Sequence, residues 1–509
     1  MSSSPEGVQS MGSRILSGVL WKAGSQIGTQ LTRMAVALVL ARLLTPHEWG
    51  LAAMVLVFSG FVVVFTDNAL GTALIQRKVL FPGDRSTVFW LSALIGLLLA
   101  LAGVACSGLI ARFYGEPDVR PLFVVASLGF LVTSLGSTQA ALLIRDMKFR
   151  VLELRSMAAT LVGAAVAVVV AVKGFGPWAI VAQQVTEACV STVLLWVLSP
   201  WRPSLTFSRA SIRRLGRFAT NVFAENFLFQ AGRNAGNLLI GRFLGAAALG
   251  VYSLATTVIL VPFWRIAAPL QQVFLPAFSE MQQDRERIAT LWIRTTRLIA
   301  AVAMPALVAL IILAPDFVEV VLGSRWEAAT PVIQILAWVG LLQALQALNA
   351  EILLALDRSG TLLRFTVVWL VATTGATAIG LHWGILGVAA CYAVATAFVE
   401  LLRAYLTVDA LGIPLRRVLA SLRGVAEASG LMAIVLFGLR AGLVAQDVPP
   451  VLRLVLLVGV GAVVYLCACA WRAPEVRAEV EGLVTRYRGS SRKLDSLEPG
   501  LLERSSTPV

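Results

Sequence analysis

Long apolar runs separated by short polar turns dominate the 509-residue chain. A helix of about 20 mostly apolar residues can cross a bilayer. Turn signals such as "TPHEWG" at 45–50 and "KGFGP" at 173–177 separate runs of that length. The pattern therefore predicts an all-α polytopic membrane protein with about fourteen transmembrane helices, at 18–44, 50–76, 87–113, 120–143, 153–173, 177–198, 217–243, 247–278, 293–314, 331–356, 362–381, 385–407, 427–445 and 451–471.

The composition agrees with this prediction. Hydrophobic residues make up 58% of the chain, and charged residues only 14%, against roughly 25% in soluble domains. The net charge of +14 does not indicate a nucleic-acid partner, because the basic residues lie between apolar runs and not on a soluble face. Lys and Arg gather in every second connection, which places both termini in the cytoplasm by the positive-inside rule.

The sequence shows no signature of catalysis. The five cysteines lie inside apolar runs, so neither a disulfide framework nor a metal site is expected. A Gly-rich phosphate loop and zinc-ligand spacings are absent from the sequence, and its two histidines lie in expected outer loops. We therefore expect no catalytic residues, no cofactor and no enzyme activity.

Two segments 200 residues apart repeat the same pattern. Residues 30–50, "QLTRMAVALVLARLLTPHEWG", match residues 230–250, "QAGRNAGNLLIGRFLGAAALG", at seven of 21 positions without a gap. Six expected helices separate the copies, so both run in the same direction. The repeat predicts two parallel six-helix lobes around a central cavity plus a C-terminal helix pair. From the N-terminus, the expected parts are a cytoplasmic segment at 1–17, an N-lobe at 18–198, a cytoplasmic linker at 199–216, a C-lobe at 217–407, the helix pair at 427–471 and a basic, disordered cytoplasmic tail at 472–509.

Polar side chains form matching stripes on the two repeated helices. Parallel-repeat transporters bind substrate near the bilayer midplane, between the repeats. At 100° per residue, one face of each helix carries amides and a guanidinium. We expect these stripes, with Arg265 of the eighth helix, to bind substrate through Lys22, Gln26, Gln30, Arg33, Asn226, Gln230, Arg233 and Arg265.

Arg33 needs a partner or a function, because an arginine at mid-membrane depth is costly. It lies 11 residues before Leu44, about 16 Å along a helix, which is too far for its side chain to reach the interface. Arg42 and Arg242 are close enough to do so and are expected to be structural. An alternative for Arg33 is a buried ion pair that packs the bundle, with Asp67 or Glu225 as its partner.

Three carboxylates lie inside expected helices, and the sequence allows two roles for them. Asp67, Glu187 and Glu225 are either counter-ions of the arginines or groups that couple transport to an H⁺ or Na⁺ gradient.

Residues 13–77 carry a family resemblance. "LARLLTPHEWG", an apolar helix with Asp67 and then "GTALIQRK" resemble the start of the polysaccharide transport (Wzx-type) flippases of the MOP superfamily. The resemblance implies two six-helix lobes and the transfer of undecaprenyl-pyrophosphate-linked oligosaccharides across the bacterial inner membrane for lipopolysaccharide, capsule or exopolysaccharide synthesis. Membrane lipids, a polysaccharide polymerase and the export machinery are the partners that such a role implies.

This substrate would account for the cationic stripe. Guanidinium groups suit pyrophosphate oxygens, and the amides suit sugar hydroxyls. Two other functions stay open. A multidrug cation antiporter of the same superfamily would use the carboxylates, whereas a polytopic glycosyltransferase or polymerase would need a larger outer loop than 315–330.

Overall fold

The structure is a computed structural model that describes residues 28–67, 71, 74, 82–479 and 481–482. Side chains at 61–67, 82, 209–229, 261–270 and 272 lie outside the description. The expected cytoplasmic segment 1–17 and the part of the expected tail from 483 onward also lie outside it.

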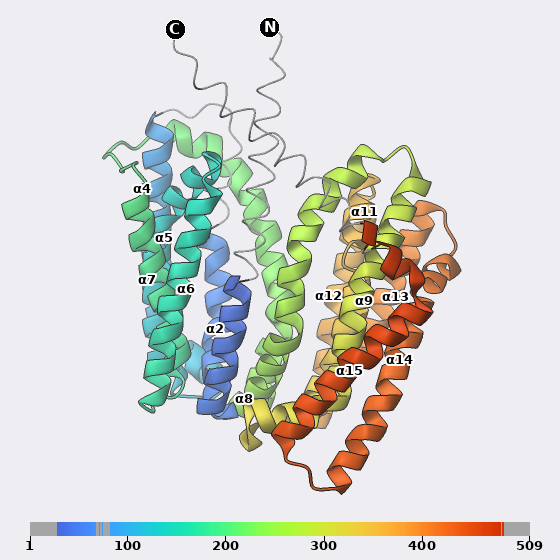
Figure 1. Cartoon of the computed structure of the whole chain (residues 1–509). Coiled ribbons are helices and arrows are strands. Elements are labelled where there is room, and N and C mark those ends of the chain that lie inside the picture. The colour runs from blue at the N-terminus through green and yellow to red at the C-terminus, as the bar shows by residue number, and fades with distance from the viewer. Residues whose placement is uncertain (1–27, 68–70, 72–73, 75–81, 480, 483–509) are drawn as a thin grey trace, which may run out of the picture. The chain divides into compact units, whose positions relative to one another are not determined.

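The described chain is helical and contains no strand, as expected. An unlabelled helix at 28–43 precedes the helices labelled in Figure 1. These are α2 (Pro46–Asp67), α4 (Pro82–Tyr114), α5 (Val119–Arg145), α6 (Phe149–Val172), α7 (Trp178–Leu198), α8 (Arg209–Glu280), α9 (Arg285–Phe317), α10 (Ala329–Leu345), α11 (Asn349–Ala355), α12 (Ser359–Gly380), α13 (Gly384–Leu411), α14 (Leu415–Ala445) and α15 (Pro450–Arg472).

Two breaks divide the longer helical runs. Gly245 interrupts α8 with φ 84° and ψ −179°, a conformation open to glycine but strained for residues with a Cβ. A turn at 346–348 separates α10 from α11. With α8 counted as two helices and α10 with α11 as one span, each of the fourteen expected spans falls on a helical segment of the described chain.

Ten described segments are long and apolar enough to cross a bilayer, so the chain is a multi-pass membrane protein. Helix ends differ from the expected spans. α8 begins at Arg209 and α14 at Leu415, both inside segments that the sequence suggested were connections. The apolar run marks the part of a helix that can lie in lipid, whereas backbone hydrogen bonding continues through the polar turns beside it.

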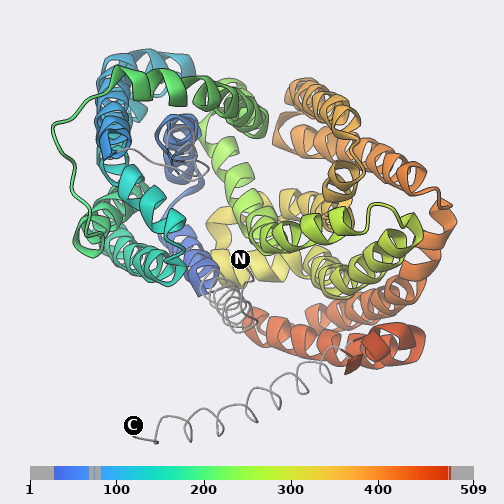
Figure 2. The same cartoon turned by 90° about the horizontal axis from the view of Figure 1, so that it is seen from above.

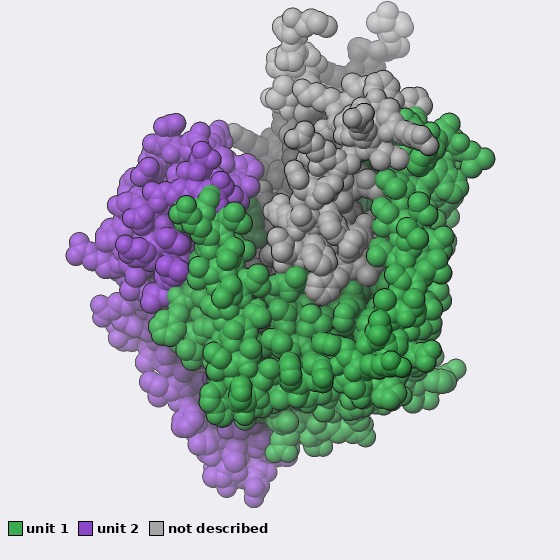
Figure 3. Space-filling model, turned by 180° about the vertical axis from the view of Figure 1, so that it is seen from behind, with its two compact units in different colours: residues 1–273, 317–340, 360–399 green, residues 274–316, 341–359, 400–509 purple. Residues whose placement is uncertain are grey.

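Packing divides the chain into two compact units, coloured separately in Figure 3. The first consists of 1–273, 317–340 and 360–399, and the second of 274–316, 341–359 and 400–509. Within the first unit α2 packs against α4, α5 and α7, as the view in Figure 2 shows. The expected lobe boundaries stay a prediction.

The second unit joins the C-terminal helix pair to α9. Leu313 of α9 packs with Met432 and Leu436 of α14 and with Leu457 of α15. The carboxylate of Asp316, fully buried, accepts hydrogen bonds from Arg440 and Arg453 at the same end of the pair.

Candidate functional site: a polar cavity in the first unit

A cavity of about 700 Å³ lies among helix 28–43, α2, α7 and both halves of α8, all within the first compact unit. Its apolar lining includes Leu40 and Trp49. Thirteen of the described lining residues are polar, namely Gln30, Arg33, Ser59, Gln183, Gln184, Glu187, Gln230, Arg233, Asn234, Asn237, Ser253, Thr256 and Thr257. The cavity wall therefore carries many polar groups among its apolar ones, although apolar helices enclose it.

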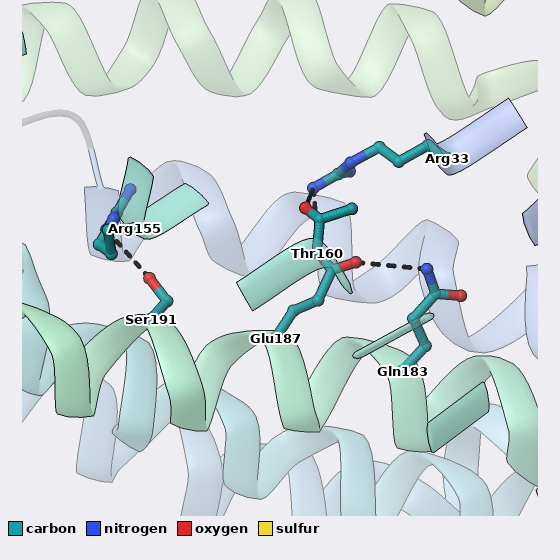
Figure 4. Close-up of polar contacts among 6 residues, drawn as sticks. All are labelled: Arg33, Arg155, Thr160, Gln183, Glu187 and Ser191. Carbon is teal, nitrogen blue, oxygen red and sulfur yellow. Dashed lines mark hydrogen bonds and ion pairs between the residues drawn. The ribbon is translucent and has the colours of Figure 1, made fainter. Parts of the chain in front are cut away.

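Arg33 and Glu187 form an ion pair on the cavity wall (Figure 4). Arg33 Nη2 lies 2.9 Å from Glu187 Oε2 and 3.4 Å from Thr160 Oγ1. On the other carboxylate oxygen, Gln183 Nε2 donates to Glu187 Oε1 at 3.2 Å. The Arg33 side chain is 41% exposed, and an ion pair with that access to water stabilises a fold by only about 0–1 kcal/mol. Helix packing thus depends little on this pair.

Two glycines leave room for polar side chains. A Cβ on Gly163 of α6 would lie 2.5 Å from Glu187 Cγ. A Cβ on Gly60 of α2 would lie 2.3 Å from Gln230 Nε2. Because such distances are too short for real contacts, a side chain at either position would displace a cavity-lining group.

The first half of α8 contributes polar side chains from successive helical turns, which form one stripe along the cavity. Gln230, Arg233, Asn234 and Asn237 all line the cavity, and Asn234 Nδ2 donates to the Gln230 carbonyl at 3.0 Å. Since helix 28–43 contributes Gln30 and Arg33 at the equivalent positions of the repeat, both copies face one cavity.

Hydroxyls line the second half of α8. Thr256 Oγ1 donates to the Tyr252 carbonyl at 2.8 Å, and Thr257 Oγ1 to the Ser253 carbonyl at 2.7 Å. Each hydroxyl proton is used within the helix, which leaves the oxygen lone pairs available to accept from a ligand.

The structure brings five of the expected site residues together: Gln30, Arg33, Glu187, Gln230 and Arg233. Of the other expected residues, Lys22 and Gln26 lie outside the described chain, and so do the side chains of Asp67, Glu225, Asn226 and Arg265. Arg33 pairs with Glu187, one of the three carboxylates expected from the sequence as counter-ions of the arginines, although Asp67 and Glu225 were the partners named for Arg33 itself.

The arginines at the helix ends have separate contacts. Arg42 donates to the carbonyls of Val320 and Val321, and the Arg242 guanidinium lies over the rings of Phe113 and Phe243. Neither lines the cavity.

Sequence analysis missed several lining residues. Two of them, Gln183 and Gln184, stand with the expected Glu187 on one stretch of α7, "QQVTE", where polar residues three and four apart share a face. That spacing was a usable signal. The hydroxyls of α8 carried none, because Ser and Thr are common within membrane helices, where they bond to the preceding turn.

The part of the lining that the structure describes carries two guanidinium groups and one carboxylate. Among the described residues there is no cluster of three His, Cys, Asp or Glu suited to a metal ion. The charge balance favours anionic ligands, and the surrounding amides and hydroxyls can both donate to and accept from a polyhydroxylated group.

Comparison with known proteins identifies the family. The family described as "Polysaccharide biosynthesis protein" matches residues 39–331, more than half of the chain. Lipopolysaccharide biosynthesis protein WzxC of Escherichia coli (strain K12) is 30% identical over 365 residues, which cover 70% of this chain and 73% of that protein. Teichuronic acid biosynthesis protein TuaB of Bacillus subtilis (strain 168) is 25% identical over 477 residues, 92% of this chain and 97% of that protein.

Solved structures show the same fold at low identity. A lipid II flippase MurJ in an inward closed conformation matches with a TM-score of 0.73 and 14% identity, over 90% of this chain and 99% of that one. An inward-facing multidrug resistance MATE transporter of the MOP superfamily matches with a TM-score of 0.61 and 14% identity, over 78% of this chain and 99% of that one. These likenesses establish the helical arrangement as the MOP fold, and the sequence matches place the chain in the Wzx-type polysaccharide biosynthesis protein family.

Proposed function

We propose that this protein is a flippase that moves undecaprenyl-pyrophosphate-linked oligosaccharides across the bacterial cytoplasmic membrane for the synthesis of a surface polysaccharide. The observation that carries the proposal is the cavity wall, where Gln30 and Arg33 of one repeat and Gln230 and Arg233 of the other face the same space. Family membership supports the substrate class. WzxC is named for lipopolysaccharide biosynthesis and ExoT of Rhizobium meliloti (strain 1021) for succinoglycan biosynthesis transport.

The geometry suggests how a pyrophosphate would bind. Glu187 Oε2 pairs with Nη2 of the Arg33 guanidinium, and a phosphate oxygen has the charge and geometry to replace that carboxylate. Gln183, which donates to Glu187, can hold the released carboxylate in place. Amide groups on α7 and α8 would then bind sugar hydroxyls while the lipid tail stays in the bilayer.

Alternating access with both termini in the cytoplasm completes the proposal. Under this scheme the cavity receives the lipid-linked head on the cytoplasmic side and opens to the other side. A polysaccharide polymerase and the export machinery would act on the product after it is released.

The decisive experiment measures transfer of a radiolabelled undecaprenyl-pyrophosphate oligosaccharide across proteoliposomes. We expect Arg33→Ala and Arg233→Ala each to reduce transfer at least tenfold. Transfer by Arg33→Lys should lie between that of Arg33→Ala and that of the wild type, because lysine keeps the positive charge but cannot bind phosphate through two parallel hydrogen bonds. Arg364→Ala is the matched control, since Arg364 is an exposed arginine of α12 that does not line the cavity.

A cation antiporter is the second candidate, because one carboxylate, Glu187, does line the cavity. Efflux of a cationic dye that survives both arginine substitutions and is lost in Glu187→Gln, with no transfer of the lipid, would favour the antiporter and reject the flippase. Transfer of the lipid without dye efflux would favour the flippase and reject the antiporter.

A further inference from the structure

The start of α14 and the end of α15 meet in the second compact unit, where the two helices lie side by side (Figure 1). A Cβ on Gly424 of α14 would lie 2.3 Å from the carbonyl oxygen of Arg472, the last residue of α15. Beside this contact, Glu427 stands between two arginines. Its Oε1 accepts a hydrogen bond from Arg423 Nε at 2.7 Å, and its Oε2 lies 3.6 Å from Arg472 Nε. These three side chains form a cluster that joins the two helices.

Both arginines of this cluster keep hydrogen-bond donors to spare. Each contacts Glu427 through Nε, so the two Nη groups of each guanidinium remain for other acceptors. Neither Arg423 nor Arg472 has a second hydrogen-bond or ion-pair partner among the described residues. Their side chains are 79% and 45% exposed. The cluster therefore presents accessible guanidinium groups, whose fork of N–H donors suits phosphate oxygens.

The cluster carries an excess of positive charge. Two guanidinium groups and one carboxylate give it a net charge of +1. Arg416 is exposed and lies seven residues before Arg423, which places it about 20° away around α14 and about 10 Å away along it, so it adds to the charge of this face. The next residue, Arg417, is already paired, because its Nη1 donates to Glu286 Oε2 at 2.9 Å.

Exposed apolar side chains adjoin the cluster. Trp471 is 70% exposed, and the Arg472 guanidinium lies over its ring, 4.3 Å from the centroid. Leu419 is 60% exposed and lies one helical turn before Arg423 on the same face of α14. Because α14 and α15 can both span the membrane, an exposed tryptophan at a helix end is typical of the membrane interface. A ligand with an apolar part and a negative head fits this surface better than a soluble anion does.

The side of the membrane agrees with such a ligand. The cluster lies at the end of α15 from which the C-terminal segment continues, and the expected topology places that end in the cytoplasm. Basic pockets between membrane helices on this side suit the headgroups of anionic phospholipids.

We propose that Arg423 and Arg472 bind the phosphate of an anionic phospholipid in the cytoplasmic leaflet, with Arg416 increasing the attraction and with Trp471 and Leu419 contacting the apolar part of the lipid. This binding site lies outside the cavity and does not rest on the proposed flippase function.

Native mass spectrometry of the full chain measures the affinity for the first bound lipid. The probes are dioleoyl phosphatidylglycerol and dioleoyl phosphatidylcholine, which share their acyl chains and differ in net charge. We expect the wild type to prefer phosphatidylglycerol. Arg423→Gln and Arg472→Gln should each weaken phosphatidylglycerol binding about fivefold and leave phosphatidylcholine binding unchanged.

Glu427→Gln separates ligand binding from local packing. It removes the same ion pairs as the arginine variants do, yet it should tighten phosphatidylglycerol binding by a similar factor, because it removes the competing negative charge. Arg364→Gln is the matched control, since Arg364 is a single exposed arginine of α12, and it should leave the affinity unchanged. A thermal melt establishes that each variant is folded.

The proposal fails if the wild type binds both lipids equally, if Arg364→Gln weakens binding as much as Arg423→Gln does, or if Glu427→Gln weakens it. Displacement of phosphatidylglycerol by inorganic phosphate would instead indicate a site for a soluble anion. Loss of undecaprenyl pyrophosphate binding in Arg423→Gln, with phosphatidylglycerol binding unchanged, would assign the cluster to the transported lipid and reject the phospholipid. Absence of any transfer by the wild type would reject the flippase function and leave these affinities standing.

Discussion

Gly50 and Gly250 occupy equivalent positions of the internal repeat, and each packs against the backbone of the other copy. A Cβ on Gly50 would lie 1.7 Å from the Ala246 carbonyl oxygen, and one on Gly250 would lie 1.8 Å from that of Pro46. Pro46 and Ala246 are themselves equivalent in the gapless alignment. The contact is therefore reciprocal, as two-fold related surfaces require, and it brings the start of α2 against the second half of α8.

Gly50→Ala or Gly250→Ala should force this contact apart. Overpacking a side chain typically costs about 1–3 kcal/mol, and here the obstacle is backbone, which yields less readily than a side chain. We expect a lower melting temperature and easier access to the cavity past Trp49, which lines it one residue before Gly50. The measurement is the labelling rate of Ala53→Cys by a membrane-impermeant thiol reagent in a background without native cysteines.

Gly430→Ala is the control for this pair. Gly430 lies in α14 with open space around it, so alanine should be neutral or stabilise the helix by about 0.5–1 kcal/mol. Unchanged melting and labelling in the Gly50 and Gly250 variants would mean that the two helix ends do not meet as the structure shows.

Glu187→Gln should separate substrate binding from packing. Glutamine keeps the hydrogen-bonding shape and removes the charge that occupies Arg33, so the affinity for undecaprenyl pyrophosphate should rise several-fold. Stability should change by less than about 1 kcal/mol, because the pair is open to water. Native mass spectrometry gives the affinity, and a thermal melt gives the stability.

The exchange Arg33→Glu with Glu187→Arg provides the contrasting test. It rebuilds an ion pair with the charges reversed. If the pair only packs the helices, the double variant should transfer substrate nearly as well as the wild type. Under the proposed function it should stay inactive, because the new arginine stands on α7 at a different height and angle.

The helical architecture was predictable from the sequence because apolar runs of bilayer length leave few alternatives. Even the division of α8 at Gly245 follows from the apolar runs on either side, expected at 217–243 and 247–278. The starts of α8 at Arg209 and α14 at Leu415 were not predictable in this way. Polar turns such as "RASIRRLG" at 209–216 look like a connection on hydropathy alone, whereas backbone hydrogen bonding makes them helical.

The candidate site was predictable in part for a similar reason. The repeat placed Arg33 and Arg233 at equivalent positions, and equivalent helices of parallel repeats face a shared axis. Glu187 was among the three carboxylates expected as counter-ions, but the choice of Glu187 as the partner of Arg33 was not predictable. The two residues are 154 positions apart, and the packing of α6 and α7 beside helix 28–43, with Gly163 making room for Glu187, decides the pairing.

Asp316 should be one of the most sensitive positions in the second unit. Its carboxylate is fully buried and bonds to Arg440 and Arg453. Asp316→Asn removes the buried negative charge that both arginines contact, and breaking a buried pair costs about 3–5 kcal/mol. We expect a large drop in melting temperature and faster proteolysis between α14 and α15.

Asp409→Asn is the matched change for comparison. Asp409 also pairs with an arginine, Arg358, but its side chain is 56% exposed, so the loss should stay within about 1 kcal/mol. Equal effects of the two substitutions on melting would show that burial does not set the strength of the Asp316 contact.

Trp326 links the turn after α9 to the end of helix 28–43. It is fully buried, its Nε1 donates to the Ala41 carbonyl at 2.6 Å, and its ring meets that of Trp49 edge-on with centroids 6.0 Å apart. Trp49 in turn lines the cavity. The Trp326 side chain therefore contacts both the end of helix 28–43 and the start of α2, and fixes the position of Trp49.

Trp326→Phe keeps an aromatic ring and removes the donor, which leaves the Ala41 carbonyl without that bond. An unsatisfied buried acceptor costs about 1–3 kcal/mol, and the smaller ring adds a cavity, so we expect a clear fall in melting temperature together with slower transfer of the lipid-linked substrate. Trp338→Phe, at a site 49% exposed, should change neither. If Trp326→Phe lowers stability and leaves transfer at the wild-type rate, the support it gives to Trp49 is structural and does not shape the cavity.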